Sequence, residues 1–163
     1  MPFRKILLPV DGSKHSLNAA EYAVALAQAT GARVILVTVY RGEAIVTDEP
    51  PYQTIPDEMR QKAEHRLSPY REMMAKAGVA FDEMILEGPT AEAIADAAQR
   101  READLIVMGS KGRSNLGGLI FGSNAHTLLH ISPCPVMAIR LRHHLNPGAA
   151  APGCPPAAPE PED

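Results

Sequence analysis

The chain has 163 residues, of which 45% are hydrophobic and only 4% are aromatic, and its formal net charge at pH 7 is −3. This length supplies the core of one domain and excludes two domains of ordinary size, and no apolar run is long enough to span a bilayer. The two cysteines provide no disulfide framework, and the apolar run near the N-terminus is shorter than the core of a signal peptide. We therefore expect a cytoplasmic protein without membrane association.

The C-terminal segment differs in composition from the rest of the chain. Residues 146–163 hold six of the 15 prolines and three of the 19 acidic residues, with no Lys or Arg. No large apolar side chain there offsets the entropy of ordering, which predicts a disordered tail after a domain that spans residues 1–145. That domain carries 16 basic and 16 acidic residues. Its neutrality argues against binding to nucleic acid or to anionic membranes through bulk charge.

The first half of the domain alternates strand, helix and strand. The apolar run Phe3–Pro9 predicts a buried strand, and Asp11-Gly12-Ser13 predicts a turn that caps the following helix. That helix is expected to end at Gly31, after apolar residues at helical spacing, namely Leu17, Ala20, Val24 and Ala27. The β-branched run Arg33–Tyr40 is typical of a central strand covered on both faces.

The second half continues the alternation after residues 41–56, a Pro-containing segment that we interpret as a loop. Asp57–Ala77 is helical in composition, and Pro69 inside it is expected to kink or split the helix. The remaining pattern predicts a strand at Phe81–Leu86, a helix opened by Pro89-Thr90, a strand at Asp104–Met108, a helix at Ser123–Ile131 and a strand at Val136–Ile139.

Strands that are apolar throughout and alternate with helices predict an α/β fold, an open five-stranded parallel sheet with helices on both faces. Ligands of such sheets bind beyond the carboxyl ends of the strands, where the strand order reverses. Two segments are therefore candidates for a site: PVDGS after the first strand (Pro9–Ser13) and GSKGRSNLGGLIFGS after the fourth (Gly109–Ser123).

The second of these segments has the composition of a phosphate-binding loop. Its glycines let a ligand approach the backbone closely, and the helix expected from Ser123 adds unpaired N–H groups and a favourable dipole. Lys111 and Arg113 add positive charge, and no acidic residue occurs from Leu105 to Pro159. The Lys and Ser/Thr that follow the second Gly of a Walker A loop are missing, and no G-x-G-x-x-G follows the first strand.

The glycine spacing that is present is G-x2-G-x9-G-S, formed by Gly109, Gly112, Gly122 and Ser123. Together with the opening KILLPVDGS and the closing SPCPVMAIR, this spacing resembles the universal stress protein family, and in particular its ATP-binding subclass. The resemblance implies a Rossmann-like fold of the adenine nucleotide alpha hydrolase type. It also implies ATP with Mg²⁺ as the ligand and a homodimer formed through the strand Val136–Ile139.

The resemblance further implies roles for individual residues. The glycine loop would wrap the ribose and phosphates with Gly109, Ser110, Lys111, Gly112, Arg113, Ser114 and Asn115. The helix N-terminus would bind phosphate through Gly122, Ser123 and Asn124. The adenine and ribose side would be lined by Pro9, Val10 and Asp11, with Asp11 on the ribose or on a metal-bound phosphate. Val39 would pack on adenine and offer backbone hydrogen bonds.

We expect a regulatory or sensing role in the stress response, because no residue is recognisable as one that positions water for ATP hydrolysis. Slow hydrolysis stays open. An enzyme of adenylate chemistry on the same scaffold would need a catalytic motif where this chain has PVDGS. The glycines at 109, 112 and 122 argue against a nucleotide-independent dimeric interaction protein, which would not require them. His126 and His130 have the spacing of a helical metal pair but no nearby carboxylate, so we expect them to face solvent.

Overall fold

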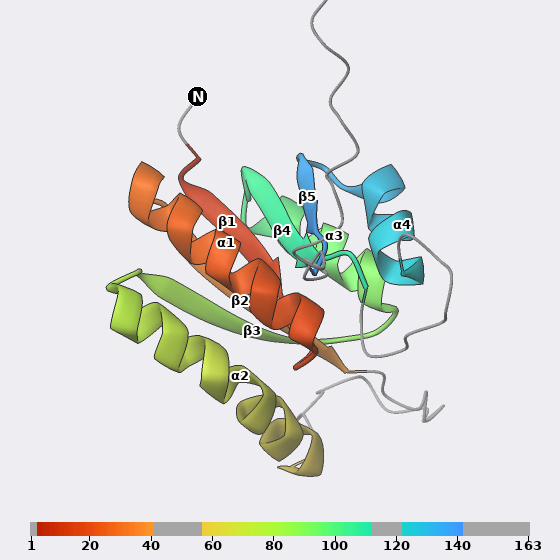
Figure 1. Ribbon diagram of the computed structural model, residues 1–163. Coiled ribbons are helices and arrows are strands. Elements are labelled where there is room, and N and C mark those ends of the chain that lie inside the picture. Colours follow the sequence, from red (N-terminus) through yellow and green to blue (C-terminus); the bar gives the residue numbers. More distant parts are fainter. Residues whose placement is uncertain (1–2, 41–56, 112–121, 142–163) are drawn as a thin grey trace, which may run out of the picture.

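The computed structural model describes residues 3–40, 57–111 and 122–141 (Figure 1). These residues form strands and helices in the predicted alternating order: β1 (Lys5–Pro9), α1 (Lys14–Thr30), β2 (Arg33–Tyr40), α2 (Asp57–Ala77), β3 (Phe81–Glu87), α3 (Thr90–Arg100), β4 (Leu105–Gly109), α4 (Ser123–Ile131) and β5 (Val136–Ile139). The segment 41–56, most of the glycine loop, the predicted domain end at 145 and the predicted tail at 146–163 lie outside the described residues.

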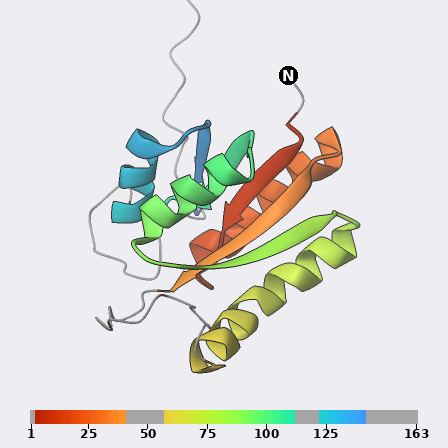
Figure 2. The ribbon, with the colours of Figure 1, turned by 180° about the vertical axis from the view of Figure 1, so that it is seen from behind.

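All strand pairs are parallel, and the strand order is β3-β2-β1-β4-β5. Helices α1 and α2 cover one face of the sheet, and α3 and α4 cover the other, as Figures 1 and 2 show from opposite sides. Side chains alternate between the two faces, so that Ile6 and Leu8 of β1 pack toward α1 and α2 while Leu7 packs toward α3 and α4. The predicted fold class is confirmed.

Helix α2 runs through Pro69 without interruption, so the predicted split of this helix does not occur. Pro69 is exposed, and the buried side chains of α2 lie on the opposite face, namely Ala63, Leu67, Tyr70 and Met74. The proline removes one hydrogen bond on the solvent side, where water can satisfy the carbonyl that it frees. Packing of the buried face therefore keeps the helix continuous.

Small side chains let α1 lie close to the sheet. The helix buries Ala19, Ala20, Ala23 and Ala27. At the carboxyl end of β4 the approach is closer still, because a Cβ added to Gly109 would lie 2.8 Å from the carbonyl carbon of His15. Contacts of carbon atoms at that distance do not occur without a shift of the backbone, so the packing of α1 on β4 requires a glycine at position 109.

Asp104 joins the amino ends of β1 and β4. One of its carboxylate oxygens, Oδ2, accepts hydrogen bonds from the backbone N–H groups of Arg4 and Lys5, each at 2.8 Å. These two hydrogen bonds hold the pKa of Asp104 below its usual value of 3.8, although desolvation opposes them. The carboxylate therefore stabilises the folded state at pH values above 3.8, and that contribution is lost as the pH falls through the lowered pKa.

Replacing Asp104 with Asn should therefore lower the free energy of unfolding at pH 7 by less than about 1 kcal/mol, because the carboxylate is exposed and screened. The difference from the wild type should shrink as the pH falls from 3.8 through the lowered pKa, because the wild-type carboxyl of the folded state becomes protonated there. Urea unfolding of both proteins at pH 7 and pH 3 measures this change. Asp96→Asn is the control, since the exposed Asp96 pairs only with Arg100 on its own helix, and an equal pH dependence of both variants would contradict the assignment.

Candidate functional site

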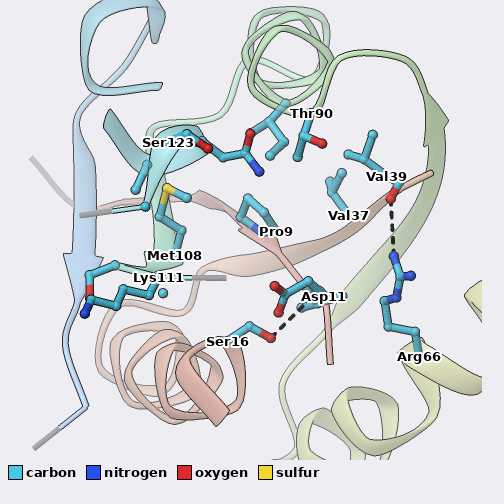
Figure 3. A pocket seen from close by; sticks show the side chains of 17 residues that line it. Pro9, Asp11, Ser16, Val37, Val39, Arg66, Thr90, Met108, Lys111 and Ser123 are labelled. Atoms are coloured by element: carbon cyan, nitrogen blue, oxygen red, sulfur yellow. Dashed lines mark hydrogen bonds between the residues drawn. The ribbon is translucent and has the colours of Figure 1, made fainter. Parts of the chain in front are cut away.

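A pocket of about 470 Å³ opens at the carboxyl ends of β1, β2 and β4 (Figure 3). It lies where β1 is flanked by β2 on one side and β4 on the other, which is the place where the strand order of this sheet reverses. The pocket brings together the predicted site residues that the structure describes, namely Pro9, Val10, Asp11, Val39, Gly109, Ser110, Lys111, Gly122, Ser123 and Asn124. Four other predicted residues, Gly112, Arg113, Ser114 and Asn115, lie outside the described residues.

The first turn of α4 forms one wall of the pocket. Gly122 is the N-cap, and it has no side chain to cap the N–H groups of the residues that follow. The N–H groups of Ser123, Asn124 and Ala125 have no acceptor within the helix, because a helix leaves the donors of its first turn unpaired. All three residues line the pocket, so this wall presents backbone donors and the positive end of the helix dipole to a ligand.

The backbone of Ser110 fixes the position of this wall. Its N–H donates to the carbonyl of Ile139 in β5, and its own carbonyl accepts the N–H of Gly122, both at 2.8 Å. Ser110 is itself buried. Because the N–H of Gly122 is used within the protein, the donors that this helix offers to a ligand come from the three residues after it.

The turn between β1 and α1 forms the floor of the pocket around Asp11. Asp11 Oδ1 accepts the N–H of Ser13 at 2.9 Å, and Ser13 Oγ accepts the N–H of Ser16 at 3.2 Å. Gly12 adopts a left-handed conformation with φ of +79°, which this turn requires. The predicted turn and helix cap are confirmed, and they leave Asp11 half-buried at the pocket.

The hydroxyl of Tyr70 in α2 stabilises this turn through hydrogen bonds. Its hydroxyl accepts the N–H of Gly12 at 3.2 Å and makes a short hydrogen bond with Ser16 Oγ. Burial raises the pKa of Tyr70, and its hydrogen bonds with Ser16 and Gly12 oppose that rise. The tyrosine is fully buried and uncharged at neutral pH, so it acts on a ligand only through the turn that it positions.

The β2 side of the pocket is apolar apart from one guanidinium. Val37, Val39 and Ile94 line it together with Thr90. Arg66 of α2 reaches this wall, where its Nη1 donates to Thr38 Oγ1 at 2.8 Å and to the carbonyl oxygen of Val39 at 3.2 Å (Figure 3). The backbone acceptor expected at Val39 is therefore already engaged by a positive side chain.

Sequence reasoning missed the contribution of α2 to the site. Arg66 lies three residues after the buried Ala63 and four residues before the buried Tyr70, so helical periodicity places it at the border of the buried face. A long charged side chain at the border of an apolar helix face was the available signal. The other lining residues that were missed are Ser16, Val37, Thr90, Ile94, Met108 and Ala125.

The pocket as a whole suits a ligand with one anionic end and one flat, apolar end. Lys111 and the first turn of α4 can neutralise an anion, and the valines of β2 can pack on a ring. Asp11 lies between these two ends and can accept hydroxyl groups or contact a bound cation (Figure 3). Among the described residues, no group of three or more His, Cys, Asp or Glu side chains could hold a metal ion by itself.

Two further features lie outside the pocket, namely the histidine pair of α4 and the character of the helices. The rings of His126 and His130 lie 4.8 Å apart between centroids, and both residues are exposed, as predicted. Within the described ranges, none of the helices has the length and apolar composition needed to cross a membrane.

Comparison with known proteins places the chain in a family. The sequence model described as "Universal stress protein family" matches residues 2–140. A protein of Thermus aquaticus, named "Universal stress protein in QAH/OAS sulfhydrylase 3'region", is 39% identical over 139 residues, which cover 85% of this chain and 99% of that protein.

Solved structures share the fold at lower identity. The hypothetical protein MJ0577 matches with a TM-score of 0.76 at 24% identity, over 88% of this chain and 99% of that one. A universal stress protein in complex with cAMP matches with a TM-score of 0.68 at 24% identity, over 85% and 98% of the two chains. The universal stress protein of Archaeoglobus fulgidus in complex with dAMP matches with a TM-score of 0.65 at 24% identity, over 85% and 99%. With the family match across nearly all of the described residues, the chain belongs to the universal stress protein family.

Proposed function

We propose that this protein binds ATP, together with Mg²⁺, in the pocket between β1 and β4, and that it acts in the cytoplasm as a regulator or sensor in the stress response. One observation carries the proposal. The first turn of α4 and Lys111 line a pocket whose opposite wall is apolar. The solved structures of family members with cAMP and with dAMP support an adenine nucleotide as the class of ligand.

In this proposal the cationic end of the pocket binds the phosphates and the apolar end binds the base. The phosphates would lie against the N–H groups of Ser123 and Asn124 and the ammonium of Lys111, where the dipole of α4 favours negative charge. The adenine would pack on Val39, with Pro9 and Val10 beside it. In this proposal Gly112, Arg113, Ser114 and Asn115 complete the contacts to the phosphates and ribose.

The residues present fit a magnesium ion that arrives with the nucleotide. Mg²⁺ keeps several of its water ligands and is held by one or two carboxylates plus substrate phosphates rather than by a complete protein cage. Asp11 is the one carboxylate among the described residues that line the pocket. It would contact the ribose or a phosphate-bound Mg²⁺, and the ion would neutralise charge on the phosphates.

The side chains that face the pocket support the proposed regulatory role. Hydrolysis of ATP requires a group that positions water as well as groups that stabilise charge in the transition state. Lys111 can stabilise charge, whereas Asp11, the carboxylate of the described wall, is held by the N–H of Ser13 in the turn. We therefore propose that the protein senses the bound nucleotide and does not hydrolyse it rapidly.

We also propose a homodimer formed through β5, which lies at the edge of the sheet. The carbonyls of Pro135 and Ile139 point to β4, where they accept the N–H groups of Ile106 and Ser110. Because N–H and C=O groups alternate between the two sides of a strand, those of Val136 and Ala138 point to the open edge. An unpaired edge of this kind is a template for another chain.

Purified protein should release intact ATP on denaturation, and adding Mg-ATP to the nucleotide-free protein should raise its melting temperature, because a ligand that binds only the folded state stabilises it. Mass spectrometry of the released molecules and a thermal melt provide the two measurements. Release of AMP and pyrophosphate during incubation with ATP would favour an enzyme of adenylate chemistry. Recovery of no nucleotide and an unchanged melting temperature would favour a nucleotide-independent interaction protein.

Replacing Gly122 with Val should abolish ATP binding while the protein stays folded. The φ of −70° and ψ of 159° at Gly122 are open to any residue, so a side chain there adds no backbone strain and instead occupies space at the phosphate end of the pocket. Isothermal titration with Mg-ATP measures the loss of binding. Ser132→Ala, a small change after the far end of the same helix, is the control, and wild-type affinity in a folded Gly122→Val protein would refute the assignment of this wall.

Replacing Ala138 with Pro should convert the dimer to a monomer, because it removes an N–H that points to the open edge and leaves the hydrogen bonds to β4 in place. Light scattering should give twice the chain mass of 17.5 kDa for the wild type and the single mass for the variant. Ala138→Val, which keeps the N–H, should remain dimeric. A dimer that survives Ala138→Pro would show that another surface forms it.

A further inference from the structure

Arg66 is a charged residue of the pocket that the proposed binding mode leaves without a role. It projects from α2, and its Nη1 donates to both Thr38 Oγ1, at 2.8 Å, and the carbonyl oxygen of Val39, at 3.2 Å. Thr38 is buried, with 1% of its surface exposed. These contacts bring the guanidinium to the carboxyl end of β2, beside the apolar wall on which the base is proposed to pack (Figure 3).

The charge of Arg66 is matched by no carboxylate in the part of the chain that the structure describes. Among the other described arginines, some pair with acids, namely Arg33, Arg71, Arg100 and Arg101, and the rest are exposed to solvent, namely Arg4, Arg60 and Arg140. Arg66 is half-buried, and the acceptors of its hydrogen bonds are uncharged oxygens. A guanidinium carries five N–H donors in a fixed fork, so Nε and Nη2 retain donors for a further acceptor. Since burial of an unmatched charge is costly, that acceptor is expected in the pocket.

Arg66 lies at the base end of the pocket and not at the phosphate end. In Figure 3 it stands beside Val39, on the side of Asp11 opposite to Lys111. The methylene stem of Arg66 packs on the β1–α1 turn, since a Cβ added to Gly12 would lie 3.7 Å from its Cγ. The stem and the two hydrogen bonds fix the guanidinium in place, and such fixed groups are the ones that discriminate between ligands.

We propose that Arg66 and the carbonyl of Val39 together recognise the adenine ring, an inference that rests on the proposed nucleotide binding. A carbonyl oxygen has two lone pairs, so that of Val39 can accept from the exocyclic amine of adenine as well as from Arg66. The guanidinium then donates to the ring nitrogen beside that amine. Guanine carries an oxygen in place of the amine, and this oxygen would face the Val39 carbonyl, so the carbonyl disfavours guanine, whereas the guanidinium can donate to either purine.

The test compares the wild type with Arg66→Met, which keeps an unbranched apolar stem but has no donor. Affinities are measured by titration with ATP, GTP, adenosine, 1-deaza-ATP and 7-deaza-ATP, the last two of which each lack one ring nitrogen. The wild type should bind one of the two deaza analogues about tenfold more weakly than ATP, as expected for the loss of one charge-assisted hydrogen bond. In Arg66→Met that difference should fall to about twofold or less, whereas the preference for ATP over GTP, which the Val39 carbonyl sets, should persist.

Arg60→Met is the matched control, because Arg60 is an exposed arginine on the same helix and makes no contact with the pocket. It should bind every ligand as the wild type does. Arg66→Lys retains the charge but not the fork, and it should also lose discrimination between ATP and the deaza analogue. This variant provides the measurement if Arg66→Met does not fold.

Three results would overturn the inference. The first is equal binding of ATP and both deaza analogues by the wild type. The second is a difference between ATP and the deaza analogue in Arg66→Met as large as in the wild type, which would show that another group donates to the ring nitrogen. The third is a loss in Arg66→Met that is large for ATP and absent for adenosine, which would place the guanidinium on the phosphates. A wild-type protein that binds none of the ligands would instead refute the proposed function itself, and the two failures are thereby distinguished.

Discussion

The burial of both faces of one parallel sheet is the constraint on which the rest of the molecule depends. Helices cover each face, so apolar side chains fill both layers and leave polar chemistry to the ends of the strands. Among the described residues, the buried polar side chains are those of Ser16, Thr38 and Ser110. Two of them line the pocket, and Thr38 accepts the hydrogen bond of Arg66 at its edge. The fold thus concentrates the buried polar side chains of the described residues at or beside this pocket.

Each wall of the pocket is positioned by an element that is distant in the sequence. Ser110, after β4, is tied to Ile139 of β5 and to Gly122 before α4, so the carboxyl edge of the sheet sets the position of the helix that faces the phosphates. Tyr70 of α2 reaches the turn after β1, and the neighbouring Arg66 reaches the end of β2. Helix α2 therefore supports two strand ends at once, although it contributes just one side chain to the lining.

The order of strands and helices could be predicted from the sequence because each strand is a continuous apolar run and each helix has a local stop or start signal such as Gly31. The phosphate side of the site could also be predicted, because Gly109, Lys111 and Ser123 belong to one contiguous segment. The base side could not, because Arg66 meets Val39 from 27 positions away and Tyr70 meets Gly12 across 58. Of the kink or split predicted at Pro69, the split was wrong, because composition does not reveal which side of a helix faces water.

The contact between Gly109 and His15 divides the pocket into a rigid wall and a variable one. At Gly109 any side chain would push α1 off the sheet, so this wall is made of backbone and has a fixed shape. The facing wall is apolar apart from one long side chain, Arg66, which reaches it from α2. A change at the base end of the pocket is therefore accessible through one substitution on α2, whereas a side chain at Gly109 would require a change in the packing of α1 on the sheet.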